Sequence, residues 1–68
     1  MGNRDRLPRY QVTWWGYFRR GATREHGEKC YYFRAASDRA AVDDARDAMR
    51  NEGVEPDGPP SVRMLPES

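Results

Sequence analysis

Aromatic and β-branched side chains alternate with other residues from Tyr10 to Phe18, and this period of two predicts a β-strand. A second run over residues 30–36 has the same pattern and predicts another strand. The more apolar side of each run should face the core, and these residues are Tyr10, Val12, Trp14, Gly16, Phe18, Tyr31, Phe33 and Ala35. The opposite side carries Gln11, Thr13, Trp15, Tyr17, Cys30, Tyr32 and Arg34.

The connection between these strands, residues 19–29, is longer than a typical hairpin loop of about two to five residues. Gly21 and Gly27 are both candidate turn centres. Two interpretations follow: either the strands extend into this segment, or it is a mobile loop.

Residues 38–52 have the periodicity of an amphipathic helix. Ser37 is a good N-cap, Asp38 suits the positive end of the helix dipole, and Gly53 is a good C-terminal stop. The apolar stripe consists of Ala41, Val42, Ala45, Ala48 and Met49. The charged face consists of Asp43, Asp44, Asp47 and Arg50. We interpret these aspartates as a solvated face rather than as acid-base or magnesium-binding residues.

A proline-rich stretch, residues 53–60, predicts a turn and a rigid connection, and residues 61–65 predict a short third strand with Val62 and Met64 toward the core. The chain is therefore expected to form an α+β fold in the order ββαβ. The three strands should form an antiparallel sheet in the order 2-1-3, with the helix packed on one face. Residues 10–65 would form this domain, between an N-terminal tail of residues 1–9 and a C-terminal tail of residues 66–68.

Size and composition limit what the chain can be. With 68 residues and eight aromatic rings it has room for one small soluble domain of modest stability, so self-association is a reasonable expectation. The single cysteine, Cys30, cannot form an intrachain disulfide, which favours a reducing, cytoplasmic location. No apolar run has the roughly 18 to 20 residues needed to cross a membrane, so we expect no membrane association.

Charge is distributed unevenly along the chain. Residues 1–36 carry eight Lys or Arg and three acidic residues, a net charge of +5, whereas residues 37–68 carry four Arg and eight acidic residues, a net charge of −4. This asymmetry indicates either a basic binding face or a head-to-tail contact between copies.

The sheet face away from the helix is the best candidate binding site, because large rings interleaved with arginines can stack on bases and pair with phosphates. The predicted site residues are Trp15, Tyr17, Arg19, Arg20, Arg24, Lys29, Tyr32, Arg34 and Arg63. Our first hypothesis is a non-catalytic nucleic-acid-binding accessory protein. The alternative is a protein-interaction module, a homodimer or a small inhibitor from a phage or mobile element, that buries Trp15 and Tyr17 against a partner. The same rings also fit simple cross-strand pairing.

Glu25, His26, Glu28 and Cys30 raise the question of a metal site or a nucleophile. A structural zinc site normally needs four Cys or His ligands, and this chain has one of each. A Cys-His nucleophile needs a pocket and an oxyanion hole that so small a domain can hardly enclose. We therefore predict no enzyme activity, no cofactor, no metal and no small-molecule substrate.

A hairpin with Trp and Tyr and a basic tip, then a strand and a capped alanine-rich helix, occupy residues 10–49. This arrangement resembles the small sheet-and-helix DNA-binding modules at the start of phage-type integrases. The resemblance implies DNA binding through the sheet. In those modules three strands precede the helix, whereas two are expected here.

Overall fold

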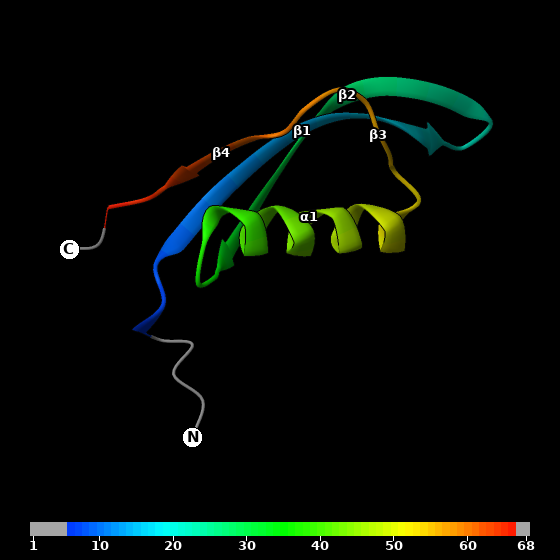
Figure 1. Ribbon diagram of the computed structural model, residues 1–68. Coiled ribbons are helices and arrows are strands. Elements are labelled where there is room, and N and C mark those ends of the chain that lie inside the picture. Colours follow the sequence, from blue (N-terminus) through cyan, green and yellow to red (C-terminus); the bar gives the residue numbers. More distant parts are fainter. Residues whose placement is uncertain (1–5, 67–68) are drawn as a thin grey trace.

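The computed structural model describes residues 6–66 of the chain, which form four strands and one helix (Figure 1). The elements in chain order are β1 (Arg9–Arg20), β2 (Thr23–Arg34), α1 (Asp38–Glu52), β3 (Glu55–Pro56) and β4 (Ser61–Met64). No helix in this part of the chain is long and apolar enough to cross a bilayer.

The central strand of the sheet is β1, which pairs with β2 on one side and with β3 and β4 in succession on the other, always antiparallel. Figure 1 shows α1 lying across one face of this sheet. The predicted α+β fold and its strand order are confirmed, with β4 as the predicted third strand. The two-residue strand β3 was not expected. The predicted tail of residues 1–9 lies partly outside the described residues, and Arg9 already belongs to β1.

The connection between the two long strands is a hairpin, because both strands extend through residues 19–29 and leave only Gly21 and Ala22 as the turn. Gly21 has φ +64°, a left-handed conformation that glycine adopts without steric cost. Gly27, the other predicted turn centre, lies within β2 opposite Gly16. Of the two interpretations, strand extension is therefore correct.

Both ends of α1 are capped as the sequence predicts. The Ser37 hydroxyl accepts a hydrogen bond from the Ala40 amide at 3.1 Å. Gly53, with φ +75°, ends the helix, and the amides of Gly53 and Val54 donate to the carbonyls of Arg50 and Met49. This is a Schellman motif, which satisfies carbonyls that the helix end would leave without partners.

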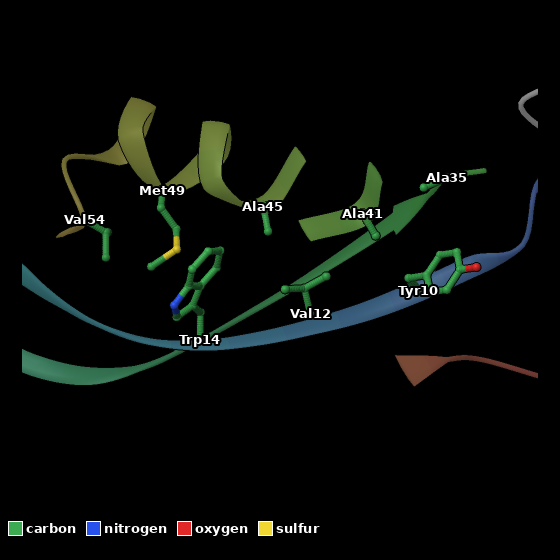
Figure 2. Packing of buried hydrophobic residues seen from close by; sticks show 8 residues of the cluster. All are labelled: Tyr10, Val12, Trp14, Ala35, Ala41, Ala45, Met49 and Val54. Atoms are coloured by element: carbon green, nitrogen blue, oxygen red, sulfur yellow. The ribbon is translucent and has the colours of Figure 1, made fainter. Parts of the chain in front are cut away.

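The core lies between α1 and the helix-facing side of β1 and β2 (Figure 2). Its buried residues are Tyr10, Val12, Trp14, Ala35, Ala41, Ala45, Met49 and Val54. The small alanines let α1 approach the sheet, and Trp14 and Met49 fill the remaining space (Figure 2). The Trp14 indole N–H also donates to the Gly58 carbonyl at 2.8 Å, which fixes the proline-rich turn against the core.

Candidate functional site

The face of the sheet opposite α1 carries the side chains of alternate residues from every strand, and we call it the open face. Its members on β1 are Arg9, Gln11, Thr13, Trp15, Tyr17 and Arg19, and on β2 they are Arg24, His26, Glu28, Cys30, Tyr32 and Arg34. On the other side of β1, the strands β3 and β4 and the residue after β3 add Glu55, Asp57, Ser61 and Arg63 to this face. Two of its rings are unusually exposed: Trp15 keeps 48% of its surface accessible and Tyr32 keeps 55%.

One end of the open face is rich in arginine. The strand register places Arg63, Gln11 and Tyr32 side by side in one row across β4, β1 and β2. The adjacent row pairs Arg9 with Arg34. These two rows contain three guanidinium groups and no carboxylate among the described residues, and we call Arg9, Tyr32, Arg34 and Arg63 the arginine end. The exposed Tyr32 ring therefore lies among three arginine side chains.

Local contacts hold parts of the arginine end in place. The Arg34 guanidinium donates to the Leu7 carbonyl at 2.7 Å, which ties the segment just before β1 to the end of β2. A shallow hollow of about 110 Å³ lies beside the Arg63 row, lined by Gln11, Thr13, Ser61, Val62 and Arg63.

The thiol of Cys30 lies in the next row and is exposed. A hydrogen bond from Tyr32, together with bonds from Gln11 at 3.3 Å and Thr13 at 3.9 Å, lowers the pKa of this thiol. Interaction with Cys30 also raises the pKa of the Tyr32 hydroxyl, because a negative charge on the nearby sulfur disfavours the phenolate. Cys30 and Tyr32 are therefore neighbouring ionisable groups on the open face, beside the arginines.

The hairpin end of the open face is a stack of planar groups. The Arg24 guanidinium lies 4.5 Å from the centre of the Tyr17 ring, and the His26 ring lies 4.4 Å from that of Tyr17 and 5.3 Å from that of Trp15. Arg24 pairs with Glu55 at 2.9 Å and His26 contacts Asp57 at 3.0 Å. These contacts hold the short strand β3 and its continuation onto the sheet, so Tyr17 and Arg24 have structural partners within the chain.

Two predicted site residues, Arg20 and Lys29, lie on the helix side of the sheet and not on the open face. The Lys29 ammonium sits 4.6 Å from the centre of the Phe18 ring, and Arg20 pairs with Glu25 at 3.5 Å. The physical reason is the strand extension: in a strand, successive side chains point to opposite faces, whereas a loop would have allowed all these cations to converge. The open face keeps Trp15, Tyr17, Arg19, Arg24, Tyr32, Arg34 and Arg63 of the predicted set.

The open face also contains residues outside the predicted binding-site set, chiefly Arg9, Gln11 and His26. Arg9 and Gln11 share the alternation of Trp15, so starting the strand one residue earlier would have found Arg9. A predicted second strand that began at Thr23 instead of Cys30 would have placed His26 on this face. No local signal predicts Asp57, because it reaches this face through a strand of only two residues.

The opposite side of the molecule has a different charge. The exposed residues of α1 include Asp43, Asp44 and Asp47. Asp43 pairs with Arg46 at 3.6 Å. Acidic residues thus concentrate on the helix, while arginines concentrate on the open face. The uneven charge along the sequence becomes a difference between two faces of the fold.

A second depression, of about 450 Å³, lies beside β1 next to the start of β3. Its lining is Tyr17, Phe18, Arg19, Arg24, Glu52, Gly53 and Glu55. The charges of this lining are mixed. Within residues 6–66 no three His, Cys, Asp or Glu side chains converge as metal ligands.

Comparison of the chain with protein-family models, with curated proteins and with solved structures gave no match.

Proposed function

We propose that this chain is a non-catalytic binding protein whose open face holds single-stranded nucleic acid. The observation that carries the proposal is the arginine end, where the exposed Tyr32 ring lies among Arg9, Arg34 and Arg63. Aromatic rings stack on unpaired bases, and guanidinium groups pair with phosphate oxygens.

The spacing of the two exposed rings supports a strand that runs along the sheet. Tyr32 lies opposite Gln11, and Trp15 follows Gln11 by four residues on β1. At about 3.3 Å per residue, the two rings are roughly 13 Å apart along the strand direction. They therefore provide two separate stacking positions. Because a duplex keeps its base faces covered, exposed rings of this kind favour an unpaired strand.

The charge of the two faces supports an anionic ligand. Phosphates would approach the arginine end favourably, whereas the aspartates of α1 would repel them. Arg19, exposed at the hairpin end of the same face, extends the positive surface beyond Trp15. Arg20 and Lys29 have no role in this proposal because they lie on the other side.

The direct test is the fluorescence anisotropy of labelled mixed-sequence DNA and RNA single strands at low salt, titrated with the full chain. We expect binding, and we expect Tyr32→Ala and Trp15→Ala each to weaken it about five-fold or more, since one lost stacking contact costs about 1–3 kcal/mol. The matched control is Met64→Ala, a large apolar side chain that is 61% exposed but lies in register with Tyr10 on the helix side. No measurable affinity at low salt would reject the proposal and favour a protein partner on the same face.

A further inference from the structure

The outer edge of β2 has no partner strand among the described residues. This strand is twelve residues long and is the last in the sheet order, with β1 on its only paired side. A long edge of unpaired N–H and C=O groups is a template for another strand.

The backbone groups that point outward can be identified from the ladder. The Ala35 amide donates to the Pro8 carbonyl at 3.1 Å, so this pair is hydrogen-bonded. Hydrogen-bonded and non-hydrogen-bonded pairs alternate in an antiparallel ladder. The odd-numbered residues of β2 therefore bond to β1, and the outward residues are Arg24, His26, Glu28, Cys30, Tyr32 and Arg34.

We infer that β2 pairs with β2 of a second copy of this chain, antiparallel, about a two-fold axis at Gly27. In this register residue 26 of one copy lies opposite residue 28 of the other, and residue 25 lies opposite residue 29. Outward-pointing residues then face outward-pointing residues, as the ladder requires.

The side chains of this register are complementary on both faces. On the helix side Glu25 lies opposite Lys29 of the second copy, and on the open face His26 lies opposite Glu28 of the second copy. The two-fold axis repeats each pair, which gives four oppositely charged or hydrogen-bonding pairs. Cross-strand pairs of opposite charge stabilise a sheet, and like charges directly opposite each other destabilise it.

Neighbouring registers are less favourable. A two-fold axis at Glu28 or Lys29 places that residue opposite the same residue of the second copy, which puts like charges together. An axis at Cys30 places His26 opposite Arg34 of the second copy. A centre at Tyr31 gives only two opposite-charge pairs, between Glu28 and Arg34. The Gly27 register therefore combines two Glu25–Lys29 charge pairs and two His26–Glu28 hydrogen-bonding pairs with no like-charge pair, and it places both open faces on the same side of one continuous sheet.

Sedimentation equilibrium of the full chain over a range of concentrations tests the inference. We expect the mass to rise from 7.9 kDa toward twice that value. Lys29→Glu and Glu25→Lys should each raise the dimer Kd by about tenfold, because each turns two attractive pairs into repulsive ones. The double variant carrying both changes should restore the dimer. A chain that stays monomeric at every concentration, or a double variant no better than the singles, would overturn the inference.

A backbone variant gives an independent readout. Cys30→Pro removes an outward N–H without removing a bond to β1, so it should abolish the dimer while the far-UV circular dichroism stays that of the folded chain. Cys30→Ser keeps the N–H and should dimerise normally. In the Gly27 register the two Cys30 residues lie about 20 Å apart, six residues along the strand. Rapid disulfide formation between copies of the wild-type chain on oxidation would contradict the register.

Discussion

Gly16 of β1 lies directly opposite Gly27 of β2, and only Gly16 is enclosed. A Cβ atom on Gly16 would lie 2.7 Å from Cγ1 of Val54 and 2.8 Å from the Glu55 carbonyl oxygen. At Gly27 the nearest atom would be Cε1 of Phe18, at 3.3 Å. Met49 at the end of α1, Val54 and the backbone of β3 can lie this close to β1 because Gly16 has no side chain.

Gly16→Ala should therefore destabilise the fold. The added methyl group must displace backbone of β3 as well as Val54, and overpacking of this kind costs about 1–3 kcal/mol. Gly27→Ala is the matched control, because the Phe18 ring is only partly buried and can move. Urea unfolding monitored by Trp fluorescence measures both. Equal losses of unfolding free energy in the two variants would show that the close approach at Gly16 is not as tight as described.

Alkaline pH should weaken the fold through Tyr31. Burial, and a hydrogen bond of 2.8 Å to the Glu52 carboxylate, raise the pKa of Tyr31 to about 12. The pKa in the unfolded chain is lower, about 10, so this contribution to stability is complete below about pH 10 and is lost as the pH rises toward 12. Urea midpoints at about pH 9 and about pH 11 should differ less for Tyr31→Phe than for the wild type. An unchanged difference would mean that Tyr31 does not carry the effect.

The thiol of Cys30 should be more reactive than an isolated cysteine at neutral pH, because its hydrogen bonds favour the thiolate. Removing the Tyr32 hydroxyl in Tyr32→Phe should raise the pKa of the thiol and slow its alkylation by iodoacetamide. The pH dependence of the alkylation rate measures this directly. Thr13→Val removes a hydrogen bond of 3.9 Å that lowers this pKa less than Tyr32 does, so it should have a smaller effect. A rate profile identical in all three proteins would contradict the described hydrogen bonds.

The helix and the two faces of the sheet follow from local patterns in the sequence. Ser37 and Gly53 mark the ends of α1, and alternation from Tyr10 to Phe18 separates the core face from the open face. Met64 shows the limit of alternation alone: it shares the register of the core face yet stays exposed, because it lies at the end of a short outer strand.

The hairpin end could not be predicted as well. Its residues are polar, with no apolar alternation to distinguish a strand from a loop, and the pairing of β1 with β2 fixes them instead. For that reason the sequence alone predicts Lys29 as part of the basic binding site, whereas the strand directs its side chain toward Phe18. The contacts of Glu55 and Asp57 with the open face arise from tertiary pairing across 31 residues of sequence and leave no local signal.

The salt dependence of nucleic-acid binding shows whether the arginines of the open face contact phosphates, and the double variant Arg9→Gln and Arg63→Gln is the probe. Each phosphate contact to a single strand contributes about 0.7 to the slope of log affinity against log salt concentration. Removing two arginines of the open face should therefore reduce the slope by about 1.4. The control Arg39→Gln and Arg50→Gln removes two exposed charges of the helix and should leave the slope nearly unchanged. Equal reductions in the two double variants would contradict the assignment of the phosphate contacts to the open face.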